Sequence, residues 1–339
     1  MLPPPACTQV LASEGAPSGA AADAARATAF SLVRVRELAA AADACVPMQQ
    51  AQQQVPAVVP TVAGALLAGA DVPRFPYEQP RLRLLCLHGF RQSGASLAGR
   101  LASLRTRLAP YVDFIFLDAP HLLPPPASLR DAPGSCNTGG DVSPSPPPRP
   151  RRAWLVSASD AAWGAAAAAA AAAGNPPPQP PPLPAPMAGG SSVERPFTEQ
   201  CVGWAESLAA LVAALRLHAP IDGMLGLSQG AAVAAAAAAE LQRSGNALGV
   251  APPRLVWLAG GFVPPPPAGS ALHADAPLRL RSLHVFGGDA YVSAAASEAL
   301  AACFAAPTTL RHAAGHLLPA SAADVARYTG FLRGNAAGA

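Results

Sequence analysis

From residue 81 onward, short apolar runs alternate with segments whose apolar residues recur at helical spacing. The apolar runs predict buried strands, and they cover residues 81–87, 112–120, 221–227, 254–260, 280–287 and 308–315. The segments with helical spacing cover residues 95–109, 198–217, 229–243, 293–304 and 320–333. Strands that alternate with helices favour βαβ units, so we expect an α/β fold with a mostly parallel central sheet and helices on both faces.

Three other segments have a composition that disfavours packing. They are rich in Pro, Ala, Gln and Gly, and they cover residues 1–79, 124–150 and 164–192. Such sequences bury too little apolar surface to offset the conformational entropy that is lost on ordering. We therefore predict a disordered N-terminal extension at 1–79 and one folded domain at 80–334, with Pro/Ala-rich insertions at 124–150 and 164–192.

Charge and apolar patterning argue against several classes of function. The formal net charge is +3 and no cluster of Lys and Arg is interleaved with aromatic residues, so we expect no nucleic-acid binding. No strongly apolar run reaches the length of about 18 residues that a membrane span needs. The 6 Cys include no C-x-x-C pair, which favours a reducing compartment, the cytoplasm, over a disulfide framework or a zinc site. Acidic residues among residues 1–45 disfavour an organelle transit peptide, although targeting by this extension stays open.

One short motif carries the strongest chemical signal. Gly226-Leu227-Ser228-Gln229-Gly230 matches the pattern G-x-S-x-G, and it lies between a predicted strand and a predicted helix. Small residues two positions before and after the Ser let the strand and the helix approach each other closely. The hydroxyl then projects from a tight turn at a helix N-terminus, where negative charge is favoured. This context predicts that Ser228 is a nucleophile; the alternative is an ordinary turn bounded by glycines.

Chain order narrows the choice of base and acid, because in folds with this motif an Asp or Glu follows the Ser and a His follows the acid. The candidate bases are His312 and His316, and His316 is better placed because it follows Gly315 on the loop beyond the last strand. Asp289 directly follows the strand predicted at 280–287, so it is the candidate that orients the base. The alternatives are a loop His and a helix-capping Asp with structural roles only.

Two backbone N–H groups are the expected donors to an oxyanion. Phe90 belongs to the loop His88-Gly89-Phe90 after the first predicted strand, and Gln229 directly follows the nucleophile. The side chain of His88 has a structural alternative, which is to anchor this loop.

These residues define a mechanism of acyl transfer. His316 removes the proton of Ser228 as Ser228 attacks an acyl carbonyl, and Asp289 orients the imidazole and stabilises the imidazolium. Water then hydrolyses the acyl-enzyme. The chemistry requires no metal ion and no organic cofactor, and its substrate is a small-molecule acyl ester or thioester.

The motifs together resemble the FSH-type family of serine hydrolases, which have the α/β-hydrolase fold. The similar segments are LLCLHGFRQSG (84–94), FIFLDAPHLLP (114–124), RAW (152–154), GMLGLSQGAA (223–232), LHVFGGDAYV (283–292) and HAAGHLLP (312–319). The resemblance implies that Ser228, Asp289 and His316 form the catalytic triad and that the substrate is a carboxylic ester. The turn before Asp289 is one residue shorter than is usual in the family. A thioesterase is the second reading, and a noncatalytic ligand-binding protein of the same fold is the third.

Overall fold

A computed structural model describes residues 81–125, 150–179, 199–245, 247–273, 276–288 and 291–334. The N-terminal extension predicted at 1–79 lies outside the described residues, as do most of the insertion at 124–150 and the predicted site residue Asp289. The domain division predicted from the sequence therefore stays a prediction.

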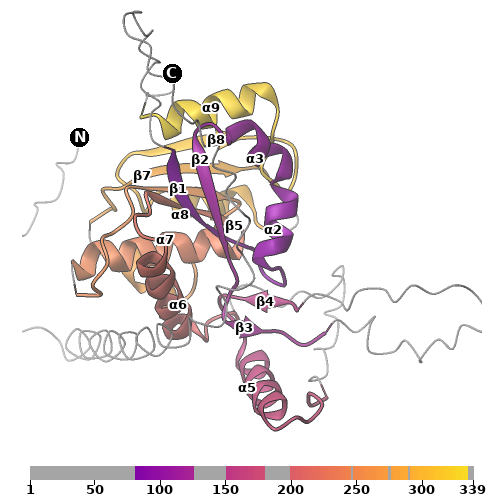
Figure 1. Ribbon diagram of the computed structural model, residues 1–339. Coiled ribbons are helices and arrows are strands. Elements are labelled where there is room, and N and C mark those ends of the chain that lie inside the picture. Colours follow the sequence, from indigo (N-terminus) through magenta and orange to yellow (C-terminus); the bar gives the residue numbers. More distant parts are fainter. Residues whose placement is uncertain are drawn as a thin grey trace, which may run out of the picture.

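A six-stranded parallel sheet forms the centre of the fold (Figure 1). Its strand order is β2-β1-β5-β6-β7-β8, and every neighbouring pair is parallel. The strands are β1 (Leu82–Leu87), β2 (Val112–Leu117), β5 (Gly223–Leu227), β6 (Leu255–Ala259), β7 (Arg281–Phe286) and β8 (Pro307–Arg311). Each one lies at a predicted apolar run, which confirms the predicted strands and the α/β class.

Helices cover both faces of this sheet (Figure 1). One face carries α6 (Trp204–Leu217), α7 (Gln229–Ser244) and α8 (Ala294–Ala301), and the other carries α2 (Gly94–Arg100), α3 (Ala102–Leu108) and α9 (Ala322–Leu332). Side chains of β1 alternate between the two cores: Leu85 packs toward α7, whereas Leu84 packs toward α3. Because both faces are buried, the strands appear in the sequence as continuous apolar runs.

Two helices differ most from their predicted bounds, each for a local reason. The helix predicted at 95–109 is divided into α2 and α3 at Leu101, which has φ −93° and ψ 9°. The helix predicted at 198–217 begins only at Trp204, because Gly203 before it has φ 92°. A residue in this left-handed region cannot continue a right-handed helix.

The alanine tract was predicted to be part of the unstructured insertion at 164–192, and for residues 164–172 that prediction is wrong. Residues Ala158–Ala172 form the helix α5. Ala has the highest helix propensity of all residues, and the side chain of Ser157 caps the helix by accepting a hydrogen bond from the Asp160 N–H. Helix α5 packs beside a small antiparallel sheet of β3 (His121–Leu122) and β4 (Arg152–Ala153), at the end of β2 (Figure 1).

The order of the strands locates the switch point of the sheet. The chain passes from β1 to β2 on one side and later returns to place β5 on the other side of β1. Ligands of open α/β sheets bind at the carboxyl ends of the strands at such a switch point. The loops that follow β1 and β5 are those with His88-Gly89-Phe90 and Ser228. In the described part of the chain, no helix is long and apolar enough to cross a bilayer.

Candidate active site

Ser228 occupies a strained turn between β5 and α7. Its backbone has φ 56° and ψ −120°, at the N-cap of α7. The N–H of Ser228 donates to the carbonyl of Ala259 at 2.8 Å, and its own carbonyl accepts from the N–H of Ala231 at 2.9 Å. A positive φ in a residue with a side chain costs on the order of 1–3 kcal/mol, and it persists where the surrounding structure enforces it. The half-buried Ser228 is therefore held at the carboxyl end of β5 by the fold itself.

The two glycines of the motif are required by this close approach of strand and helix. A Cβ at Gly226 would lie 2.3 Å from the carbonyl oxygen of Gly230. A Cβ at Gly230 would lie 2.2 Å from the carbonyl oxygen of Leu87 and 2.6 Å from that of His88. In each case the obstacle is backbone, which cannot rotate away. The structure thus shows the close approach of strand and helix that the G-x-S-x-G spacing predicts.

A second strained residue lies in the loop after β1, on the other side of the same switch point. Among the described residues other than glycine, only Ser228 and Arg91 have a positive φ, and that of Arg91 is 60°. Arg91 follows Phe90, one of the two predicted oxyanion donors. No backbone hydrogen bond to another described residue is formed by the N–H groups of Phe90 and Gln229.

His88 has the structural role that was considered as its alternative. The side chain is 0% exposed, and its Nε2 accepts from the N–H of Ala119 at 3.0 Å. Because Nε2 accepts, Nδ1 carries the proton and donates to the carbonyl of Gly89 at 2.8 Å. Burial lowers the pKa of His88 below its usual value, which agrees with a neutral ring. His88 thereby anchors the loop that contains Phe90.

His316 lies on the loop after β8, as predicted, and close to the turn that holds Ser228. A Cβ at Gly260 would lie 3.1 Å from Cε1 and 3.3 Å from Nδ1 of His316. Gly260 directly follows Ala259, whose carbonyl accepts the Ser228 N–H. One backbone segment at the end of β6 therefore adjoins both residues.

Two further side chains surround His316. The ring of Tyr291 packs against the imidazole, with centroids 5.4 Å apart. The guanidinium of Arg100, at the end of α2, donates to the carbonyl of His316 at 3.1 Å. Neither residue had been singled out from the sequence, because both contacts join segments that are far apart along the chain.

Of the predicted acid and the other candidate base, the structure describes only the base, His312. Asp289 lies outside the described residues. Gly288 before it belongs to the loop after β7, and Tyr291 beyond it packs against His316. His312 directly follows β8, and its Nδ1 accepts a hydrogen bond from the N–H of Ala314 at 3.1 Å.

A set of buried polar residues next to the Ser228 turn was not predicted from the sequence. Its centre is the side-chain amide of Gln229, which bonds to the backbone of Trp154 and Leu155 and to Gln200. The signal for this role was a Gln at the start of a helix whose other buried residues are almost all apolar. The segment RAW (152–154) resembles the family, but the sequence gives no role for Trp154.

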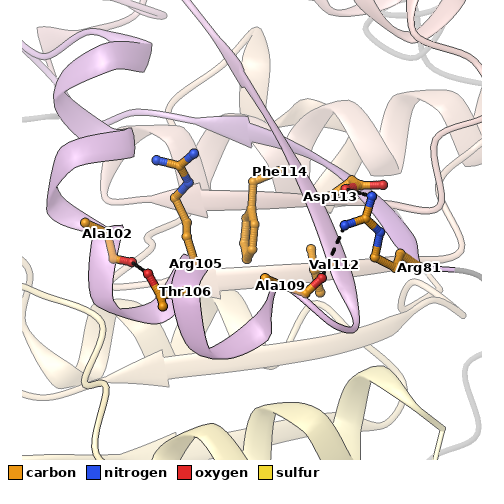
Figure 2. A pocket seen from close by; sticks show the side chains of 8 residues that line it. All are labelled: Arg81, Ala102, Arg105, Thr106, Ala109, Val112, Asp113 and Phe114. Atoms are coloured by element: carbon orange, nitrogen blue, oxygen red, sulfur yellow. Dashed lines mark hydrogen bonds and ion pairs between the residues drawn. The ribbon is translucent and has the colours of Figure 1, made fainter. Parts of the chain in front are cut away.

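Two pockets of the described residues lie away from Ser228. A pocket of about 430 Å³ lies between α3 and β2 and includes Arg81 and Val112 at the amino ends of the strands (Figure 2). It is therefore at the end of the sheet opposite Ser228. A second pocket of about 330 Å³ lies beyond the carboxyl end of β2, among β3, α5 and the start of α6, where His121 bonds to the carbonyl of Gly203. Among the described residues, no three His, Cys, Asp or Glu side chains are grouped so that they could hold a metal ion.

Comparison with known proteins identifies the family of this chain. Residues 78–328 match the family described as Serine hydrolase (FSH1). Esterase OVCA2 of Homo sapiens is 32% identical over 255 residues, which cover 75% of this chain and 96% of the relative. Esterase OVCA2 of Bos taurus is 33% identical over the same shares of the two chains. The solved structure of Zea mays acyl-protein thioesterase 2 is 18% identical, with a TM-score of 0.43 over 77% of this chain and 96% of that chain. The resemblance inferred from the sequence is confirmed, and the chain belongs to the serine hydrolase (FSH1) family.

Proposed function

We propose that the protein hydrolyses carboxylic esters through a triad of Ser228, His316 and Asp289. The observation that carries this proposal is the backbone of Ser228, which is held at φ 56° on a turn that only glycines at 226 and 230 permit. Strain of this kind in a half-buried polar residue at a switch point supports a functional role rather than a packing role. The curated relatives named above are esterases by name, which favours the ester as substrate.

In the proposed reaction each of these groups has a defined role. His316 accepts the proton of the Ser228 hydroxyl as the oxygen attacks the carbonyl carbon, and Asp289 stabilises the resulting imidazolium. The N–H groups of Phe90 and Gln229 stabilise the oxyanion, each by on the order of 3 kcal/mol. His316 then protonates the leaving alcohol, and a water molecule, deprotonated by His316, releases the acid and restores Ser228.

The N-terminus of α7 adds to this stabilisation. Ser228 is the N-cap residue of this helix of 16 residues, so the positive end of its dipole faces the nucleophile. Developing negative charge on the tetrahedral intermediate is favoured there. No step draws on a metal ion or a cofactor.

The same residues would also cleave a thioester, because only the leaving atom differs. We therefore keep thioesterase activity as the second candidate and a noncatalytic ligand-binding role as the third. For the location of the protein we propose a reducing compartment, the cytoplasm. Its support is that Cys86, Cys201 and Cys303 carry free thiols among the described residues.

Hydrolysis of a matched pair of substrates tests the proposal. An oxygen ester and a thioester with the same short acyl chain would be assayed with the full chain, with Ser228→Ala and with Ser244→Ala at the far end of α7. We expect faster turnover of the ester, its loss in Ser228→Ala, and normal turnover in Ser244→Ala. Preference for the thioester would favour the second candidate, and no turnover of either substrate would favour the third.

A further inference from the structure

The side chain of Gln229 makes three hydrogen bonds although it is only 1% exposed. Its Oε1 accepts from the backbone N–H of Trp154 at 2.9 Å. Its Nε2 donates to the carbonyl of Leu155 at 2.7 Å and to Oε1 of Gln200 at 2.5 Å. These three contacts use one acceptor and both donors of the amide, so the orientation of the side chain is fully determined.

Trp154 is bonded at three separate points. Besides the N–H that binds Gln229, its indole Nε1 donates to the carbonyl of His88 at 2.9 Å. Its own carbonyl accepts from the hydroxyl of Ser207 on α6 at 2.5 Å. The indole is 0% exposed and lies against the His88 ring, with centroids 5.5 Å apart.

These contacts connect the two predicted oxyanion donors. Gln229 supplies one backbone N–H, and its side chain is bonded to Trp154. The other donor, Phe90, lies two residues after His88, whose carbonyl is bonded to the indole of the same Trp154. A single buried residue therefore joins both halves of the oxyanion hole, beside the switch point between β1 and β5.

We propose that the Trp154–Gln229 pair is a positioning unit that sets the spacing and direction of the two N–H donors. This inference rests on the proposed function, because it assigns the pair a task in stabilising the oxyanion. The two residues do not touch the reacting atoms through their side chains. They act through the backbone N–H groups of Gln229 and Phe90. The strained φ of Arg91, which follows Phe90, is a further sign that this loop is held in one conformation.

The test uses a pair of substrates that differ only at the acceptor atom. A p-nitrophenyl ester and its thionoester, with sulfur in place of the carbonyl oxygen, have the same acyl chain and leaving group. Well-placed N–H donors favour the oxygen substrate, because sulfur is larger and accepts hydrogen bonds weakly. A variant that merely reduces the amount of folded enzyme lowers both rates equally and leaves their ratio unchanged.

Two variants each have a matched control. Trp154→Phe removes the indole N–H, and Trp257→Phe removes an indole that is also 0% exposed but has no hydrogen-bond partner among the described residues. Gln229→Met removes the buried amide, and Gln242→Met removes an exposed amide on the same helix, whose contact to the Arg279 carbonyl is 3.5 Å. We expect the ratio of kcat/KM for the two substrates to fall by about tenfold in Trp154→Phe and in Gln229→Met, mainly through kcat for the ester. The controls are expected to keep the wild-type ratio.

Each outcome decides between defined alternatives. Equal losses on both substrates in Trp154→Phe and Gln229→Met would overturn the positioning role and leave the proposed function intact. Full hydrolysis of the ester by Ser228→Ala, run in the same series, would overturn the proposed function itself. If Gln229→Met does not fold, Trp154→Phe decides alone, since it keeps an aromatic ring and every backbone hydrogen bond of residue 154.

Discussion

The imidazole of His316 lies directly against the backbone of Gly260, so that a Cβ on residue 260 would stand 3.1 Å from Cε1. The preceding carbonyl, that of Ala259, accepts the N–H of Ser228 at 2.8 Å. Two consecutive residues at the end of β6, Ala259 and Gly260, therefore adjoin the proposed nucleophile and the proposed base. Gly260 also has φ 53°, a conformation that residues with a side chain rarely adopt.

Gly260→Ala is accordingly expected to displace His316. The new methyl group would press on the imidazole, and displacements of the order of 1 Å at a catalytic group cost about 10- to 100-fold in turnover. The measurement is kcat for a short-chain ester, together with the thermal midpoint. Gly330→Ala on α9 is the control, because a Cβ there meets nothing within 4 Å. Normal kcat in Gly260→Ala would show that His316 is not the base, or that its loop adjusts freely.

Asp289→Asn should preserve the fold and lower kcat by several orders of magnitude, because an amide leaves the imidazole in the wrong tautomer. His312→Ala should cost far less, since the Nδ1 of His312 accepts a local hydrogen bond from the N–H of Ala314. Steady-state kinetics of both variants on one ester make the comparison. Near-normal turnover of Asp289→Asn would mean that another acid orients the base. Equal losses in His312→Ala and His316→Ala would reopen the choice between these two residues.

His284 predicts how stability depends on pH. The side chain is 2% exposed on β7, its Nε2 has no hydrogen-bond partner among the described residues, and burial lowers its pKa from 6.5 to about 4. The neutral form is favoured in the folded state, so this contribution to stability is complete above pH 6.5 and is lost as pH falls from 6.5 toward 4. The loss is on the order of 3 kcal/mol at the acidic end.

Chemical denaturation at several pH values between neutral and about pH 4 checks this expectation. His284→Leu should show a flatter dependence of the unfolding free energy on pH than the wild type. His273→Leu, which changes an exposed histidine on the 3-10 helix η4 (Ala268–His273), should show the wild-type dependence. Identical curves for His284→Leu and the wild type would rule out this residue as the source of acid sensitivity.

Much of this architecture was predictable because its determinants are local. The strands are buried on both faces, so that β6, for example, appears as an uninterrupted apolar run, Leu255–Ala259. The Ser228 turn was predictable because the constraint that shapes it acts between Gly226 and Gly230, within five consecutive residues.

Other features depend on contacts that no local pattern encodes. The hydrogen bond between Trp154 and Gln229 spans 75 positions, and that between Arg100 and His316 spans 216. Helix α5 was not predicted because the composition of the alanine tract suggested disorder. The high helix propensity of Ala and the N-cap at Ser157 instead favour a helix.

Deletion of residues 1–79 is expected to leave a folded enzyme. The segment is rich in Pro, Ala and Gln, and the match to the serine hydrolase family begins at residue 78. We expect kcat/KM on a short-chain ester to change by less than about twofold, because such sequences bury little apolar surface. The matched assay compares the truncated and full chains at equal concentration of folded protein. A large loss of turnover in a soluble, folded truncation would instead assign this segment a part in the site.

Covalent labelling tests the central claim, that Ser228 is the nucleophile, most directly. A fluorophosphonate would be incubated with the full chain, and the modified peptide would be located by mass spectrometry. The mechanism predicts one adduct per chain, on Ser228, with no adduct in Ser228→Ala and normal labelling in Ser244→Ala. An adduct on another residue, or labelling that persists in Ser228→Ala, would contradict it.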